Sequence, residues 1–126
     1  MSDEKLQRGF KKLRELGSKS PAEDLKIFDF VPGFGQALVE YEFCDIYNRP
    51  GLDLKARQMV TIAGLTALGY AVNQLHVHVR MALKAGCTKL EIYETMIQMA
   101  PFAGFPAVIN ALKAAKEVIE ALEKAS

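Results

Sequence analysis

Residues 74–80 hold the side chains of this chain that are best suited to acid–base chemistry. His76 and His78 are its two histidines. Histidine is the side chain whose ordinary titration range lies nearest to neutral pH. Gln74 stands four residues before His78, a spacing that places both side chains on one face of a helix. The segment is therefore the first place to look for a site of proton transfer.

Helical geometry separates the two histidines from each other. Residues two positions apart on a helix point in different directions, so His76 and His78 cannot share one metal ion. Neither has a cysteine or a carboxylate four residues later to complete a metal site. We therefore predict no metal ligands. The stripe expected to face the core, which lies between the two histidines, contains Val72, Leu75, Val79 and Leu83.

His78 has the more suggestive surroundings. Gln74 can contact it directly, and the small residues expected around it leave room for a ligand or another helix. These small residues are Ala71, Ala82 and Ala85. We predict that His78 is catalytic and that Gln74 orients it or the substrate. The alternative is that His78 is only a packing residue, which is the interpretation we keep for His76.

Two further side chains are candidates for chemistry. Arg57 lies in the first turns of an apolar helix, where its guanidinium needs a carboxylate partner. That partner is either a carboxylate on another helix or the carboxylate of a ligand. A structural ion pair is the more common role of such an arginine. If the chain is an enzyme, we predict that Arg57 binds the substrate. Cys87 directly precedes a predicted helix, where the helix dipole favours a thiolate. A buried thiol with a packing role is the alternative.

Helical periodicity runs through the chain, and no segment shows the sustained alternation of a strand. The fold class is therefore predicted as an all-α helical bundle. Asp53 and Thr88 are expected N-caps, with Glu91 completing a capping box. The helix over 54–68 is apolar nearly all round and should form the buried centre. The expected helices cover about residues 3–16, 35–47, 54–68, 71–85, 89–100 and 105–122, with one more helix starting at Pro21.

Composition limits the class of protein. The 126 residues are half hydrophobic and one quarter charged, with a net charge of +1, as in one soluble globular domain over 1–126. This balance gives no nucleic-acid signal. The longest apolar run, 59–72, is too short and interrupted for a membrane span. With two cysteines and no leader pattern, we expect a cytoplasmic protein. A second apolar face at Val77 and Met81 predicts subunit contact.

Several segments, taken together and in order, closely resemble the carboxymuconolactone decarboxylase family. They are residues 48–57, 61–65, 75–83, 86–94, 98–100 and 104–107, within a core of about 35–115. The resemblance implies an all-helical homo-oligomer, a trimer or hexamer, with sites near subunit boundaries. It places His78 at the family's recurring histidine. In the decarboxylase branch, the implied reaction is loss of CO2 from a lactone carboxylate without a metal or organic cofactor.

The chain departs from the patterns of both branches. The related alkylhydroperoxidase D-like branch has a Cys-x-x-Cys pair before the histidine, and this chain has none. Decarboxylase-like members usually carry glutamate at the position of Gln74 and often at that of Gln58. They carry tyrosine at the position of Phe102. An amide cannot shuttle a proton, and a phenyl ring has no hydroxyl donor.

Two classes of function follow from these residues. The first is a decarboxylase-like enzyme that acts on a small carboxylated lactone or related acid, with His78, Gln74 and Arg57 at its site. The second is an oligomeric binding or accessory protein that keeps the scaffold without the chemistry. A thiol-dependent peroxidase acting through Cys87 alone is a weaker third hypothesis, because it lacks a second cysteine nearby.

Overall fold

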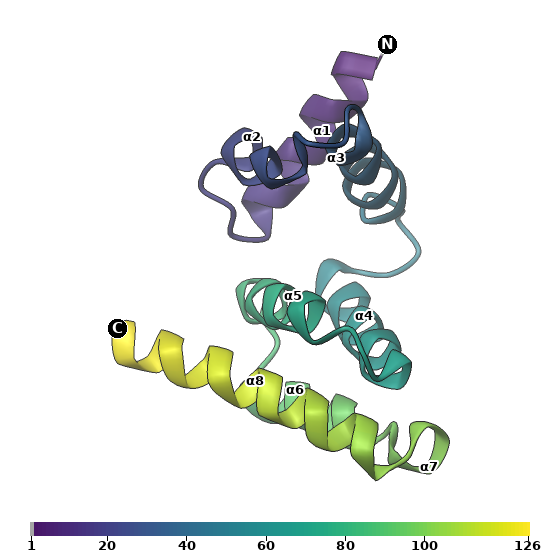
Figure 1. Ribbon diagram of the computed structural model, residues 1–126, viewed down its shortest axis with the longest axis vertical. Coiled ribbons are helices and arrows are strands. Elements are labelled where there is room, and N and C mark those ends of the chain that lie inside the picture. The colour runs from purple at the N-terminus through teal and green to yellow at the C-terminus, as the bar shows by residue number, and fades with distance from the viewer. Residues whose placement is uncertain (1) are drawn as a thin grey trace. The chain divides into compact units, whose positions relative to one another are not determined.

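The computed structural model describes residues 2–126, and Ser2 only through its backbone. The chain forms two compact units, one reaching to Asp53 and the other running from Leu54 to Ser126 (Figure 1). All the regular elements within the described residues are helical, which confirms the predicted all-α class. In the same residues no helix is both long and apolar enough to cross a membrane.

The first unit begins with α1, Ser2–Glu15, which closely matches the predicted helix. Phe10, Leu13 and Leu16 are buried at helical spacing. Pro21 starts a helix as predicted, but only a short one. The elements that follow α1 in this unit are α2 (Pro21–Asp24), the 3-10 turn η1 (Leu25–Phe28), α3 (Phe34–Leu38) and the π-helix η2 (Val39–Ile46).

The predicted helix over 35–47 is present, but its winding changes at Val39. From there the turns widen to the π form, as the hydrogen bond from Tyr47 N to Glu42 O of 2.9 Å shows. This π-helical stretch packs against α1. Gly9 allows the close approach, since a Cβ atom at that position would lie 2.5 Å from Val39 Cγ1.

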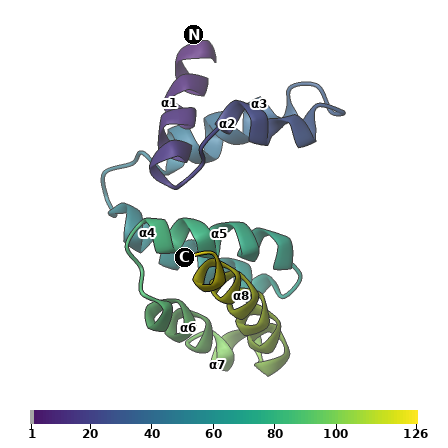
Figure 2. The same ribbon diagram turned by 90° about the vertical axis from the view of Figure 1, so that its left-hand side faces the viewer.

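The second unit contains the predicted site residues and five helices. Figure 2 shows α4 and α5 above α6 and α8, and the contacts agree, since α5 packs on α4 and α8 while α6 packs on α4 and α8. The bounds are α4 Leu54–Leu68, α5 Val72–Lys84, α6 Lys89–Ile97, α7 Ala100–Ala103 and α8 Phe105–Ala125. The predicted helix over 89–100 thus ends three residues early, and a separate short turn of helix contains Pro101.

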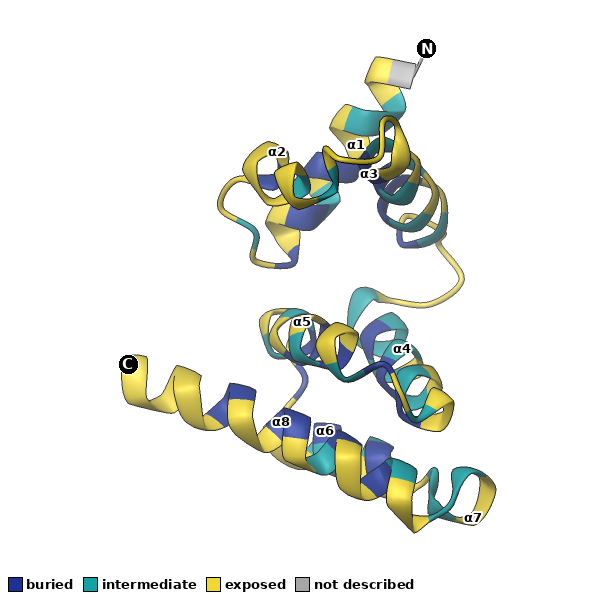
Figure 3. Cartoon of the chain, viewed as in Figure 1, coloured by how far each residue is buried: buried dark blue, intermediate teal, exposed yellow. Residues whose placement is uncertain are grey.

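A continuous apolar core holds the second unit together (Figure 3). Ile62, Ile92 and Met96 are fully buried in it. The predicted stripe on α5 is confirmed at Leu75 and Val79, which are 2% and 0% exposed. Burying each such side chain stabilises the fold by about 1.5–3 kcal/mol. This core fixes the mutual positions of the helices that carry the site.

The prediction that α4 forms the buried centre holds along one face only. Its buried residues form a single stripe, Gln58, Ile62 and Thr66, at four-residue spacing. Val60 and Leu68 lie on the other side and are 62% and 52% exposed. A helix that packs on its neighbours along one face leaves the opposite face uncovered, whatever the composition of that face.

Helical spacing predicts an apolar core face for α8 made of Val108, Ile109, Leu112, Ala115 and Ile119, and this prediction needs one correction. Val108, Ala115 and Ile119 are buried as expected, but Ile109 is 49% exposed. Ala111 and Ala114 are buried in its place. Small side chains let a neighbouring helix come close, and α8 packs extensively on α5. The face toward the core therefore follows the alanines of this helix, and Ile109 lies beside it.

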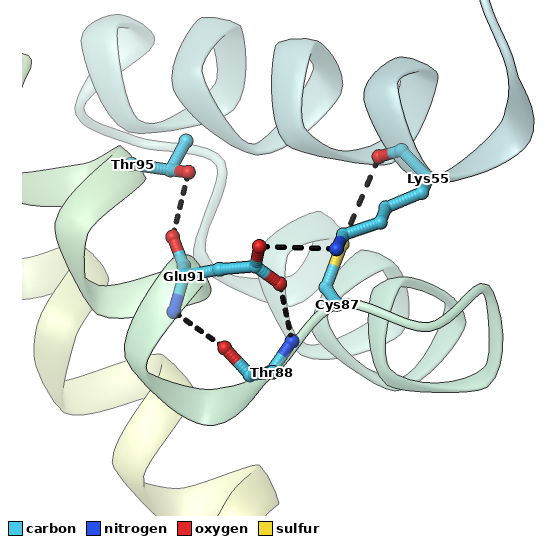
Figure 4. A network of polar contacts seen from close by, with 5 residues as sticks. All are labelled: Lys55, Cys87, Thr88, Glu91 and Thr95. Atoms are coloured by element: carbon cyan, nitrogen blue, oxygen red, sulfur yellow. Dashed lines mark hydrogen bonds and ion pairs between the residues drawn. The ribbon is translucent and has the colours of Figure 1, made fainter.

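A polar network begins α6 and ties it to α4 (Figure 4). Glu91 N donates to Thr88 Oγ1 at 3.0 Å, and Thr88 N donates to Glu91 Oε1 at 2.8 Å, which confirms the predicted capping box. Lys55 Nζ of α4 lies 3.0 Å from the other oxygen of Glu91. These contacts together lower the pKa of Glu91 below its usual 4.5, chiefly through the bond from Thr88 N–H and next through Lys55.

Candidate active site

His78 lies on the buried side of α5. It is 8% exposed, and its helical neighbours Leu75, Val79 and Ala82 are buried as well. Of the small residues predicted around it, Ala71 and Ala82 are buried, at 3% and 0% exposed, and Ala85 is half-buried. An imidazole in this setting is held in a defined position and is largely shielded from water. A fixed orientation is one condition for proton transfer, which also needs hydrogen-bond reach to the substrate.

The partner of His78 comes from α4. Its Nδ1 lies 3.1 Å from Oε1 of Gln58, whose side chain is completely buried. Nε2 of Gln58 in turn contacts the sulfur of Met81 at 3.9 Å. The two side chains are twenty residues apart in the chain and meet because α4 and α5 pack together. A buried amide that pairs with a histidine fixes the orientation of the ring.

Sequence reasoning did not identify Gln58 as a site residue, although it noted the amide as a departure from the family. A signal was available. Gln58, Ile62 and Thr66 recur at four-residue spacing on an apolar helix, so a core-facing α4 stripe would contain a glutamine. A buried polar side chain of this kind needs a partner, and histidine is among the residues that can provide one.

The other two predicted site residues are placed differently. Gln74 lies one helical turn before His78 but is exposed, and the Nδ1 partner of His78 is Gln58. Arg57 is half-buried on α4, next to Gln58 in the chain, and accepts a hydrogen bond from Thr61 through its backbone oxygen. Arg57 is thus related to His78 through its chain neighbour Gln58, which contacts the imidazole. The roles of Gln74 and Arg57 in a reaction stay predictions.

His76 has a structural partner on another helix. Its Nε2 lies 3.1 Å from Oε2 of Glu117 on α8, and both side chains are partly exposed. The histidines therefore face different helices, as the angular argument predicts.

The second apolar face of α5 is confirmed only in part. Val77 is 45% exposed. Met81, however, is half-buried with its sulfur against Gln58, so it belongs to the surroundings of His78. The difference arises because a long, flexible methionine can bend toward a neighbouring helix.

Cys87 is buried, in agreement with a packing role. The thiol is 4% exposed and contacts the backbone oxygen of Lys55 at 3.7 Å. Cys44 is buried as well, in the first unit. A redox cysteine needs access for its oxidant.

An open groove of about 490 Å³ lies between α4 and α6, and its surface is almost entirely apolar. It was not predicted, and neither His78 nor Gln58 lines it. Its lining residues are Met59, Val60, Ala63, Leu90, Glu91, Glu94, Thr95, Gln98 and Met99.

Comparison with known proteins supports the family resemblance of the sequence. The model of the carboxymuconolactone decarboxylase family matches residues 32–117. The chain belongs to this family. It is 34% identical over 108 residues to 4-carboxymuconolactone decarboxylase of Acinetobacter baylyi, covering 85% of this chain and 80% of the relative.

Two further relatives extend the comparison. An uncharacterised 15.0 kDa protein of Paracoccus denitrificans is 39% identical over 115 residues, which cover 90% of this chain and 86% of the relative. Nitrosuccinic acid decarboxylase of Metarhizium robertsii is 36% identical over 86 residues, which cover 68% of this chain and 59% of the relative. The two relatives with an activity in their names are both decarboxylases of small carboxylic acids, so the chain is decarboxylase-like.

Proposed function

We propose that this protein releases CO2 from a small carboxylated lactone or a related acid, with His78 as the proton-transfer group. The observation that carries the proposal is the placement of His78, a largely buried imidazole held by a buried amide. The named relatives supply the substrate class, since one acts on 4-carboxymuconolactone and another on nitrosuccinic acid.

The reaction needs one bond broken and one proton supplied. The carbon–carbon bond to the carboxylate breaks, CO2 leaves, and the electron pair stays on the substrate, where a conjugated carbonyl or a nitro group delocalises it. A proton must then be added to the substrate in place of CO2. Imidazolium at His78 delivers this proton and regains one from water. Such acid–base catalysis contributes about 10²–10⁴-fold to a rate.

Arg57 and Gln74 complete the proposed site. Arg57 would bind the carboxylate of the substrate through its guanidinium, a geometry in which two N–H groups meet two oxygens. Gln74 would orient the substrate from the exposed side of α5. We also propose a cytoplasmic homo-oligomer that works without a metal or organic cofactor. Val60, Leu68 and Val77, which are apolar and exposed in the single chain, favour contact with a further subunit.

The test is release of CO2 by the purified protein from 4-carboxymuconolactone and from nitrosuccinic acid. We expect turnover of a substrate of this class and a loss of about 10²–10⁴-fold in kcat for His78→Ala. His76→Ala is the matched control, because it removes the other histidine of the same helix, and it should change kcat less than about twofold. Turnover that survives His78→Ala would contradict the proposed role of His78.

One observation favours a second function. The partner of His78 is an amide, and an amide cannot take up or release a proton during catalysis. A binding or accessory protein on the same scaffold would therefore bind a small carboxylic acid at Arg57 and His78 without converting it. Calorimetric binding of these acids with no release of CO2 would support this second function.

A further inference from the structure

The contact between His78 and Gln58 determines which ring nitrogen of His78 can exchange protons. We propose that Gln58 is a positioning residue that keeps a hydrogen on Nδ1 of His78, so that the transferred proton enters and leaves at Nε2. The inference rests on the proposed function only for its consequence in catalysis. The position of the hydrogen is a property of the resting protein.

The orientation of the Gln58 amide follows from its two neighbours. Oε1 lies 3.1 Å from His78 Nδ1, while Nε2 lies 3.9 Å from Met81 Sδ. A thioether sulfur has no hydrogen and can only accept, so the NH2 group belongs on the side of Met81. The carbonyl oxygen then faces the imidazole. Because a carbonyl oxygen can only accept, Nδ1 of His78 must be the donor.

The opposite arrangement is disfavoured by burial. If neutral His78 carried its hydrogen on Nε2, Nδ1 would be an acceptor and would face Gln58 Oε1, another acceptor, at 3.1 Å. Turning the amide over would give Nδ1 a donor, but the carbonyl oxygen of Gln58 would then face the sulfur of Met81, which can only accept. Gln58 is 0% exposed, so water could not replace the lost hydrogen bond. An unsatisfied buried acceptor costs about 1–3 kcal/mol. This cost selects the form with hydrogen on Nδ1.

The same contact suits both protonation states of the ring. In neutral His78, Nδ1–H donates to Gln58 and Nε2 carries the basic lone pair. In the imidazolium both nitrogens carry hydrogen, and Nδ1–H still donates to the same oxygen. A proton can therefore be gained and lost at Nε2 without any change in the hydrogen bond at Nδ1. A site that needs no rearrangement between states is preorganised for proton transfer.

An amide provides this control without adding a charge. A carboxylate at position 58 would accept the Nδ1 hydrogen equally well, but its negative charge would favour the imidazolium form. It would also place an ion in a fully buried position, at a considerable desolvation cost. Gln58 orients the ring and leaves its charge free to change with the proton at Nε2.

The experiment is long-range 1H–15N NMR of the full chain labelled with 15N in the histidine rings, at a pH where the rings are neutral. The chain has two histidines, and a His76→Gln variant identifies the signals of His78. We expect a protonated Nδ1 and an unprotonated Nε2 at His78, the reverse of the form that free histidine prefers. A neutral His78 protonated at Nε2 would overturn the inference.

Two variants at position 58 separate positioning from packing. Gln58→Leu fills the same space without an acceptor, and we expect the ratio of Nδ1–H to Nε2–H to fall at least about fivefold. Gln58→Glu restores an acceptor and should retain Nδ1–H. Circular dichroism confirms the fold of each variant. If Gln58→Leu does not fold, the spectra of the unmodified chain and of Gln58→Glu still decide, because loss of Nδ1–H in Gln58→Glu contradicts the inference.

Failure of this inference differs from failure of the proposed function. If CO2 release depends on His78 but NMR finds the hydrogen of neutral His78 on Nε2, the proposed role of Gln58 is wrong and the proposed reaction still stands. If NMR finds the hydrogen on Nδ1 but the protein releases no CO2, the proposed reaction is wrong and the inferred position of the hydrogen still stands. With an active enzyme, Gln58→Leu should lower kcat by about fivefold or more with little change in KM.

Discussion

Two of the polar links between helix α4 and its neighbours differ in almost every physical respect. At Gln58 the helix reaches His78 of α5 through a hydrogen bond of 3.1 Å between side chains that are 0% and 8% exposed. One turn earlier, Lys55 reaches Glu91 of α6 through an ion pair of 3.0 Å, with both side chains more than one third exposed. The first link needs no net charge, and the second consists of two charges in contact with water.

The difference shows how burial decides what a polar contact can do. Water competes for every donor and acceptor of the Lys55–Glu91 pair, so this contact contributes little free energy and changes with salt and pH. No water competes for Gln58, so this contact is costly to break and selects one arrangement of His78. The exposed link adjusts the stability of the helices, whereas the buried link can define a reactive group.

The largest expected effect on stability is at the buried link. Gln58→Ala removes an acceptor from His78 and leaves a cavity at a site that is 0% exposed. We expect the free energy of unfolding to fall by about 3 kcal/mol, measured by urea denaturation. Gln74→Ala, an exposed glutamine on α5, is the control and should change it by less than about 0.5 kcal/mol. Equal effects of both substitutions would show that the buried amide of Gln58 stabilises the fold no more than an exposed amide does.

A smaller effect is expected at the capping box beside the exposed link. Thr88→Ala removes the side-chain acceptor for Glu91 N–H and should lower the free energy of unfolding by about 1 kcal/mol. Thr95→Ala in the interior of α6 removes a hydroxyl that bonds to the Glu91 carbonyl, which already belongs to the helix. It should cost less than about 0.5 kcal/mol in the same denaturation experiment. A larger loss at Thr95 would argue against a capping role for Thr88.

The ion pair itself should contribute still less. Lys55→Met keeps the aliphatic stem and removes the charge, and we expect a loss of about 0.5 kcal/mol at low salt. At an ionic strength of about 1 M, screening should remove the difference from the unmodified chain. Comparing urea midpoints at both salt concentrations measures it. A difference that persists at high salt would mean that this link behaves like the buried one.

The pH dependence of the exposed link has a definite sign. The pKa of Glu91 is lower in the folded chain than its usual 4.5, so ionised Glu91 stabilises the fold above that pH. This contribution is lost as the pH falls through the lowered pKa. Urea midpoints measured from pH 6 to acid should therefore fall more steeply for the unmodified chain than for Glu91→Gln. Parallel curves for the two chains would show that Glu91 contributes no such term.

The outcome at individual residues shows how far the sequence reached. Periodicity and capping residues predicted α4 in full and the start of α6 to the residue, because these signals are local. The same signals did not predict the π-helical winding after Val39, where a close approach to Gly9 accompanies the change. They also misplaced Ile109, since a helix of mixed small and large apolar residues offers several faces to the core.

The sequence by itself determined the family and the all-α class, and it favoured His78 over His76 as the candidate, because helix angles and motif order are properties of the chain alone. Only the tertiary structure decided the partner of His78. Gln58 and Gln74 are both amides near the site, and Gln74 is the nearer in sequence, but packing of α4 on α5 buries Gln58 against the imidazole and leaves Gln74 exposed. Contacts between helices depend on which faces meet, and no local pattern specifies that.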